Sequence, residues 1–188
     1  YDLASLTKVI ATTTAVMLLR EQNALDLDQP VSEFIPLANL NRLTLRHLIT
    51  HTAGLPAWRP WYTELSGTLQ YVERIAAEAA QAVPGVSRSY SDLGFILLAR
   101  VVEQAARDRF DAFCTRHIFQ PLGMTDTCFN PPTALHARCA PTEQHAERGR
   151  LLRGEVHDDN AFAQAGVSGH AGLFSTALDL ERFCRALM

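Results

Sequence analysis

The chain has 188 residues and a formal net charge of −3, and it is 47% hydrophobic and 20% charged. This balance is typical of a folded globular protein and argues against a disordered or fibrous chain. The mild acidity, without a basic stripe, indicates no nucleic-acid partner. No apolar run approaches the ~20 residues that span a bilayer, so no transmembrane segment is expected. Among the 17 Lys and Arg residues, Lys8 is the single lysine.

Helical periodicity dominates the first fifty residues. A helix is predicted over residues 5–23, and one face of it is marked by Leu6, Val9, Ile10, Thr13, Val16, Met17 and Arg20. A short helix is predicted over residues 31–35, where Pro36 ends it. Another is predicted over residues 44–50 with Thr44 as its N-cap.

The rest of the chain alternates helices with irregular segments. We expect a loop over residues 59–67 and helices over residues 68–81, 93–109, 110–118 and 177–188. Short strands are predicted near residues 127–129 and 150–153. The first helix begins almost at residue 1, and the last stops at residue 188 without a C-cap. Residues 1–188 are therefore predicted to form a single incomplete domain of a larger fold.

The cysteines and histidines offer little support for a metal site. The four cysteines, Cys114, Cys128, Cys139 and Cys184, form no C-x-x-C pair, so we expect free thiols. His47 and His51 are four residues apart, as in the zinc pattern H-E-x-x-H, but Leu48 stands where that pattern has its glutamate. A structural role for both histidines is the preferred interpretation, and no metal or cofactor is expected.

The single lysine lies three residues after a serine, so Ser5 and Lys8 form an S-x-x-K pattern. Residues three apart share a helix face, which lets the hydroxyl and the amine meet. A serine hydroxyl needs an adjacent base to become a nucleophile, and a lysine amine can serve when its pKa is lowered. An arginine effectively never loses its proton. The alternative is a surface lysine on an amphipathic helix.

A second candidate group is Tyr90-Ser91-Asp92, on a loop before the helix predicted from Leu93. A tyrosine held near a lysine can act as a proton shuttle, because cations tune the pKa of its phenol. The alternative is structural. In that interpretation Tyr90 is a half-buried, hydrogen-bonding aromatic residue and Asp92 is the N-cap of the following helix.

Five segments, in order along the chain, carry a recognisable set of motifs. They are residues 1–8 (YDLASLTK), 43–56 (LTLRHLITHTAGLP), 90–95 (YSDLGF), 119–124 (FQPLGM) and 169–177 (GHAGLFSTA). Together they resemble the serine β-lactamase-like hydrolases, in the branch related to class C β-lactamases, D-alanyl-D-alanine carboxypeptidases and esterases. The resemblance spans nearly the whole chain, and the order of the segments makes it specific.

The resemblance implies a fold and a mechanism. The fold would be α+β and of the serine β-lactamase/transpeptidase type, seen here mainly as its helical region with parts of the sheet domain missing at both ends. Ser5 would attack a carbonyl and form an acyl-enzyme, its backbone N–H would be one oxyanion donor, and Lys8 and Tyr90 would share proton transfer. The substrate would be a small molecule or a peptide: an ester, an amide, a β-lactam or a D-Ala-D-Ala peptide.

The chain departs from the family pattern at Asp92, where the family's Y-x-N segment has an amide. An ionised Asp accepts hydrogen bonds but donates none, so efficient β-lactam recognition is not expected. His170-Ala171-Gly172 superficially fits the family's H-x-G motif. We do not assign it so, because the residues that follow are predicted to open a helix rather than a strand. The third motif and the second oxyanion donor are expected outside this chain.

Other residues remain open to two interpretations. Residues 155–160 (EVHDDN) resemble a segment near the cleft rim in one carboxypeptidase-like branch, which makes His157 and Asp158 candidates for substrate binding. Asp92 is a further candidate, because it stands where the family's Y-x-N segment places its amide near the substrate. Structural hydrogen bonding is the preferred alternative for residues 155–160. Trp58, Trp61 and Tyr62 fit a pocket wall or simple packing.

A competing function is a non-catalytic penicillin- or peptidoglycan-binding module with a degenerate site. Asp92 favours this alternative, whereas the presence of both Ser5 and Lys8 counts against it. The resemblance favours a periplasmic or secreted location, with the cytoplasm as the alternative. The oligomeric state stays open.

Overall fold

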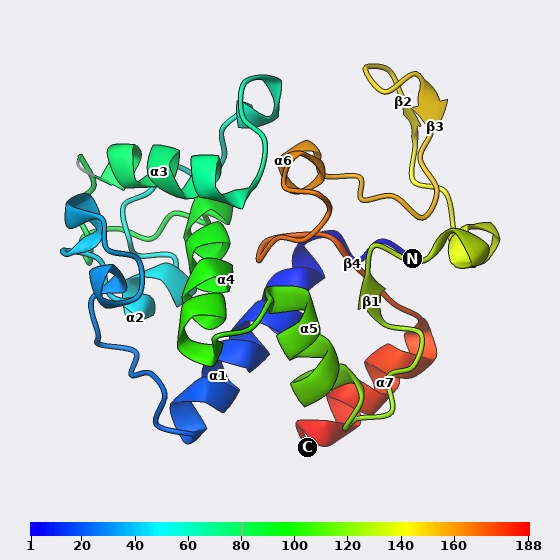
Figure 1. The fold of residues 1–188 in the computed structure, drawn as a ribbon, viewed down its shortest axis with the longest axis horizontal. Helices are drawn as coiled ribbons and strands as arrows, with labels where there is room; N and C mark the ends of the chain where they lie inside the picture. Colours follow the sequence, from blue (N-terminus) through cyan, green and yellow to red (C-terminus); the bar gives the residue numbers. More distant parts are fainter. Residues whose placement is uncertain (80) are drawn as a thin grey trace.

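Helix α4 (Asp92–Ala106) is the element around which the other helices pack. The computed structural model describes residues 1–79 and 81–188. In it α4 contacts α1 (Thr14–Glu21), α2 (Leu45–Ile49), α3 (Thr68–Ala79) and α5 (Phe110–Cys114) (Figure 1). Nine residues of α4 are buried, from Leu93 to Val102, because it is apolar on nearly all sides. The two remaining α-helices are α6 (Asp159–Ala163) and α7 (Ala177–Ala186).

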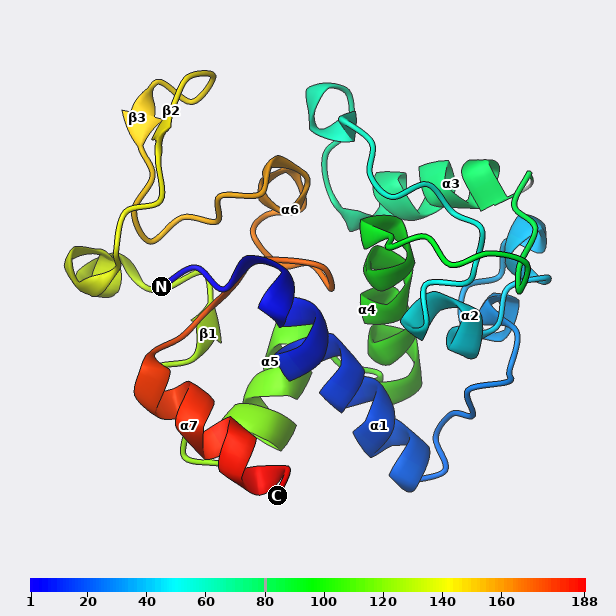
Figure 2. The ribbon, with the colours of Figure 1, turned by 180° about the vertical axis from the view of Figure 1, so that it is seen from behind.

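The strands are short and form two separate antiparallel pairs. Strand β1 (Cys128–Phe129) pairs with β4 (Leu173–Phe174), and β2 (Gln144–His145) pairs with β3 (Arg150–Leu151). The β2–β3 hairpin projects from the helical body in both views (Figures 1 and 2). The N-terminal residues run beside β4, where Leu3 N donates to Leu173 O at 2.9 Å. This contact places the first residues of the chain next to a segment more than 160 residues away.

The first predicted helix is confirmed in position but differs in winding. It begins as a 3₁₀ turn (Ala4–Leu6), continues as a π-helix (Lys8–Thr13) and ends as α1. The predicted face is partly wrong: Leu6, Val9 and Met17 are about half exposed, whereas Ala11 and Ala15, which were not part of it, are buried. A π-helix has more residues per turn than an α-helix, so the face that is buried shifts around the axis.

Most other predicted elements are confirmed within a few residues. The helix predicted over 31–35 is a 3₁₀ turn at Val31–Glu33, and Thr44 is indeed the N-cap of α2, accepting from His47 N at 3.3 Å. The helix predicted over 68–81 ends at Ala79 in the described residues, and position 80 lies outside them. The segment 110–118 is helical, as α5 followed by a π-turn at Thr115–Phe119.

Two predictions near the candidate site are corrected. Ser91, not Asp92, is the N-cap of α4: its hydroxyl accepts from Gly94 N, and Asp92 is the first helical residue. Leu173–Phe174 form strand β4 before α7 begins at Ala177, whereas we expected only a helix there. The strand forms because Phe174 finds partners in Cys128 and Asp2, and no local pattern reveals those pairings.

One large apolar cluster joins the elements. It runs from Leu3 to Phe183, and its largest fully buried side chains include Tyr71, Phe110 and Phe119. All four cysteines are free, as expected. None of the helices in the described part of the chain combines the length and apolar content of a transmembrane span.

Candidate active site

Ser5 and Lys8 lie at the start of the first helical segment, beside the N-terminus of α4. Lys8 Nζ donates a hydrogen bond of 2.8 Å to Ser5 Oγ. The residue before the serine, Ala4, has a φ of 46°, a left-handed conformation that is rare for a residue with a side chain. Asp2 Oδ1 holds this turn by accepting from Ala4 N at 2.8 Å. The chain therefore presents Ser5 on a strained, hydrogen-bonded turn, and Ser5 is exposed.

The side chain of Lys8 is only 4% exposed, which is unusual for a charged residue. Its ammonium group faces three oxygen atoms: Ser5 Oγ at 2.8 Å, Asp92 Oδ1 at 2.7 Å and the backbone oxygen of His170 at 3.2 Å. Ser5 Oγ and the His170 oxygen accept hydrogen bonds from it, and Asp92 Oδ1 forms a close ion pair with it. The two protein segments that supply Asp92 and His170 thus meet at Lys8.

Tyr90 lies against the same ammonium group. Lys8 Nζ is 4.8 Å from the centroid of the Tyr90 ring, a distance typical of a cation–π contact. The ring stacks on His51 with 4.5 Å between centroids, and the tyrosine is 52% exposed. The sequence prediction that Tyr90 approaches Lys8 is therefore matched by their positions.

His51 contacts both the ring of Tyr90 and the backbone that follows it. Its Nδ1 accepts a hydrogen bond from Ser91 N at 3.0 Å, which requires the neutral form of that nitrogen. Burial, together with the charges of Lys8 and Arg88, lowers the pKa of His51. The uncharged imidazole is thus favoured, and it fixes the residue between Tyr90 and Asp92.

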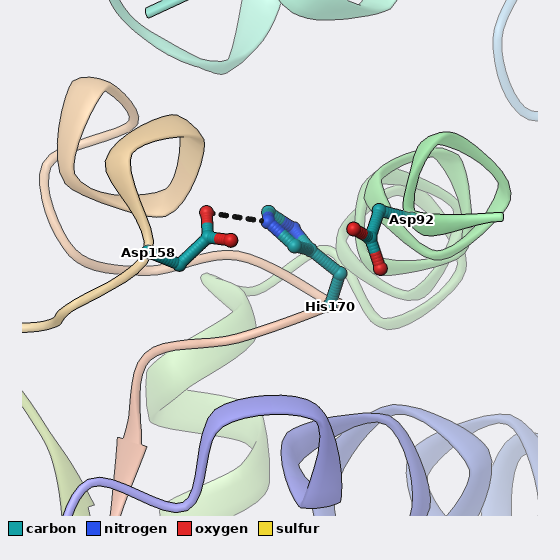
Figure 3. A group of neighbouring side chains, drawn as sticks. All are labelled: Asp92, Asp158 and His170. Atoms are coloured by element: carbon teal, nitrogen blue, oxygen red, sulfur yellow. Dashed lines mark hydrogen bonds and ion pairs between the residues drawn. The ribbon is translucent and has the colours of Figure 1, made fainter. Parts of the chain in front are cut away.

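Asp158 and His170 belong to the same site, and Figure 3 shows the His170 ring between the carboxylates of Asp158 and Asp92. His170 is 1% exposed, and its Nε2 lies 2.9 Å from Asp158 Oδ1. Burial alone would raise the pKa of Asp158, but the hydrogen bond and charge of His170 outweigh it. The Ala161 amide and the charge of Lys8 act in the same direction, and the pKa falls to about 2. Asp158 is therefore an anion at neutral pH.

Arg148 holds the segment that carries Asp158. Its side chain is 8% exposed and donates to the backbone oxygens of Val156 and His157, at 2.7 and 3.2 Å, and to the carboxylate of Asp159. A buried guanidinium with this many acceptors fixes the backbone that it binds. His157 itself does not join the cluster: it is exposed, and its Nε2 faces Glu143 at 3.2 Å.

Two glycines explain how His170 reaches Lys8. A Cβ atom on Gly169 would stand 2.0 Å from Phe95 O, and one on Gly172, where φ is +111°, would stand 2.5 Å from Gly166 O. Thr12 Oγ1 also donates to Gly169 O at 2.6 Å. The segment 169–172 can pass between the first helix and α4 only because it lacks these side chains. His170 was not predicted to lie in the site, although the fit of residues 170–172 to an H-x-G pattern was an available signal.

Asp92, Asp158 and His170 together have the composition of a metal site. Each residue offers one ligand atom, and the three atoms lie within 4.8 Å of one another. Asp92 is already paired with Lys8, however, and Asp158 with His170. A divalent ion would have to break both pairs and approach the buried ammonium, so the group fits the lysine better than a metal ion.

The remaining candidates have mainly structural contacts. His47 Nδ1 accepts from Thr44 N at 3.2 Å in a capping box, so its ring belongs to the start of α2. Trp61 is buried with its ring edge toward Tyr71, whereas Trp58 is 45% exposed.

Known proteins that are similar to this chain identify its family. The Beta-lactamase family model matches residues 1–188. The chain is 33% identical to a putative D-alanyl-D-alanine carboxypeptidase of Escherichia coli (strain K12) and 30% identical to an N-acetylmuramyl-L-alanine amidase of Bacillus subtilis (strain 168). Both matches cover 100% of this chain, with 50% and 49% of the relatives covered. The chain thus spans about half the length of these curated relatives.

A solved structure shows the same fold. The β-lactamase/D-alanine carboxypeptidase of Pseudomonas syringae superimposes with a TM-score of 0.80 at 25% identity, covering 99% of this chain and 50% of that one. The expected fold class, an α+β serine β-lactamase/transpeptidase type represented mainly by its helical region, is thereby confirmed. On the match of its whole length to the family model, the chain belongs to the Beta-lactamase family.

Proposed function

We propose that the protein is a serine hydrolase that works through an acyl-enzyme. Ser5 is the nucleophile, and Lys8 and Tyr90 share proton transfer. The observation that carries this proposal is the 2.8 Å contact between Lys8 Nζ and Ser5 Oγ in a site where the lysine is nearly inaccessible to solvent. A serine hydroxyl becomes nucleophilic when an adjacent base accepts its proton.

The proposed substrate is an ester, an amide or a D-Ala-D-Ala-type peptide. The names of the two relatives, a putative carboxypeptidase and an amidase, support hydrolysis at a carbonyl group. Asp92, His157 and Asp158 are proposed to contact the substrate at the rim of the site. The alternative is a non-catalytic penicillin- or peptidoglycan-binding module, and Asp92 is the observation that favours it, since a carboxylate offers no donor to a substrate carbonyl.

The nucleophile assignment is tested by covalent labelling of the complete natural protein. A fluorophosphonate is expected to add to Ser5 with one-to-one stoichiometry, measured by intact mass and peptide mapping. Ser5→Ala should abolish the adduct, and Ser87→Ala, which changes an exposed serine, should leave it intact. If Ser5→Ala is labelled as well as the wild type, the assignment is wrong.

The same protein separates the two functions by turnover. A hydrolase is expected to release p-nitrophenol from p-nitrophenyl acetate over many cycles, whereas a binding module should release at most one equivalent. The Ser5→Ala variant provides the background rate.

A further inference from the structure

The two carboxylates beside Lys8 are stabilised in different ways. Asp158 Oδ1 accepts a hydrogen bond from Ala161 N at 2.8 Å and lies 2.9 Å from His170 Nε2. Asp92 Oδ1 is shielded from solvent, and among the described residues it accepts no aligned hydrogen bond. The group that faces it is the Lys8 ammonium, 2.7 Å away. The negative charge of Asp92 is therefore stabilised by Lys8, whereas the negative charge of Asp158 is stabilised by His170 and by the Ala161 amide.

Lys8 in its protonated form has no lone pair to offer Ser5. Its ammonium group donates to Ser5 Oγ and to the backbone oxygen of His170, and Asp92 Oδ1 lies 2.7 Å from Nζ as an ion pair without an aligned hydrogen bond. Before Lys8 can accept the serine proton, one of its three protons must leave. Ser5 is the proton donor in the reaction, a backbone carbonyl is too weak a base, and Tyr90 meets the ammonium group with the face of its ring. Asp92 is the acceptor that remains.

The ion pair makes this transfer preferable to loss of a proton to water. If Lys8 lost its charge alone, Asp92 Oδ1 would be left as a shielded anion without a partner, which is strongly unfavourable. A proton that moves from Lys8 to Asp92 removes both charges together. A substrate that covers the site and excludes water lowers the local dielectric further, and this favours the neutral pair.

We propose that Asp92 is a catalytic residue, the terminal proton acceptor of the acylation step. As Ser5 Oγ bonds to the substrate carbonyl carbon, its O–H bond breaks and the proton moves to Lys8 Nζ, while Lys8 passes one of its own protons to Asp92 Oδ1. When the bond to the leaving group breaks, a proton returns through Lys8 and Tyr90 to that group, and Asp92 is again a carboxylate. The role of Asp92 rests on the proposed function, because without Ser5 as nucleophile no proton needs an acceptor.

Several charged and polar groups surround Asp92. Lys8 faces it from the first helical segment, Asp158 and His170 lie within 4.8 Å, and the charge of Asp92 also acts on His51. A change in the pH–rate profile would therefore reflect all of these residues together and not Asp92 alone. Chemical rescue by an added carboxylate reports on the missing acceptor more directly.

The test uses Asp92→Ala and Asp92→Asn in the complete natural protein, with p-nitrophenyl acetate as substrate. The p-nitrophenolate leaving group needs no proton, and kcat/KM reports the acylation step, in which Ser5 loses its proton. Both variants are expected to lose about 100-fold in kcat/KM. Sodium formate should restore Asp92→Ala in a saturable manner, because the side chain of Asp92 is partly accessible, at 18%. Asp28→Ala, at an exposed ion pair with Arg46, should keep wild-type activity with and without formate.

The outcomes are distinct from those of the nucleophile test. Slow labelling of Ser5 in Asp92→Asn that still reaches one equivalent, together with formate rescue of Asp92→Ala, supports the role of Asp92. A folded Asp92→Ala that formate does not rescue overturns it, as does an Asp92→Asn variant with wild-type kcat/KM. Failure of Ser5 itself to label the wild type would instead overturn the proposed function.

Discussion

At the scale of single residues, Asp158 and His170 are the clearest electrostatic pair of the site. The depressed pKa of Asp158 means that the folded state prefers the carboxylate. A group with a lowered pKa in the folded state stabilises that state above its unfolded pKa, and the contribution is lost as the pH falls through the folded pKa. The relevant window therefore runs from the ordinary value of 3.8 down to about 2.

Asp158→Asn should make stability less dependent on pH in that window. The free energy of unfolding of the wild type is expected to lose about 2 kcal/mol from this group between pH 5 and pH 2, and the variant should not show that part of the decline. Urea unfolding at a series of pH values measures it. Asp28→Asn, at an exposed pair with Arg46, should change the profile far less. An Asp158→Asn profile parallel to that of the wild type would contradict the assignment.

At the scale of elements, the site depends on a close approach between segment 169–172 and α4. A methyl group at Gly169 would stand 2.0 Å from the backbone oxygen of Phe95 and 2.9 Å from the Cβ atom of Ala99. Helix backbone cannot yield to such a contact without losing its own hydrogen bonds. The segment must therefore move away from α4, and the backbone oxygen of His170 must move away from Lys8.

Gly169→Ala is accordingly expected to reduce both stability and labelling of Ser5. The free energy of unfolding should fall by about 3 kcal/mol, measured in urea, and the fluorophosphonate labelling rate should fall with it. Gly94→Ala is the matched control, because its Cβ atom would meet Leu48 O at an ordinary 3.5 Å inside α4. That variant should stay within about 1 kcal/mol of the wild type. Equal effects of the two substitutions would show that packing at Gly169 is not special.

At the scale of the whole molecule, a single buried amide links three distant parts. Asn160 Oδ1 accepts from Tyr71 Oη at 2.9 Å and from Tyr62 N at 3.1 Å, and its Nδ2 donates to Arg59 O at 2.8 Å. It thereby joins α6 to α3 and to the segment with Trp61. Burial and the charges of nearby acidic residues raise the pKa of Tyr71, so its phenol stays a donor in this network.

Asn160→Ala should destabilise the protein as a whole. The substitution leaves a buried hydroxyl and two backbone groups without partners, and a cost of about 3 kcal/mol is expected. Urea unfolding followed by circular dichroism measures it. Asn41→Ala, which removes an exposed amide next to Ser32, should change stability by less than about 0.5 kcal/mol. A loss at Asn160 no larger than at Asn41 would rule out this linking role.

Local sequence patterns predicted where the helices lie, but not which segments form 3₁₀- or π-helix instead of α-helix. Thr44 is recognisable as an N-cap because capping depends on residues within one turn. The π-helix from Lys8 was not predicted, and its register decides why Ala11 and Ala15 are buried while Val9 is exposed. Strand β4 was also missed, since its pairing partners lie far away in the chain.

The sequence by itself determined the Ser5–Lys8 pair, because three-residue helical spacing is a local property. It also determined the family, and with it the expected approach of Tyr90 to Lys8, because the motifs and their order are read directly along the chain. Only the tertiary structure decided that the backbone oxygen of His170 reaches Lys8 and that Asp92 pairs with its ammonium. Those contacts join residues 84 to 162 positions apart, and they exist because Gly169 lets one segment pass close to α4. Packing and desolvation, which act between distant segments, therefore turn a common S-x-x-K pattern into a buried network of charges.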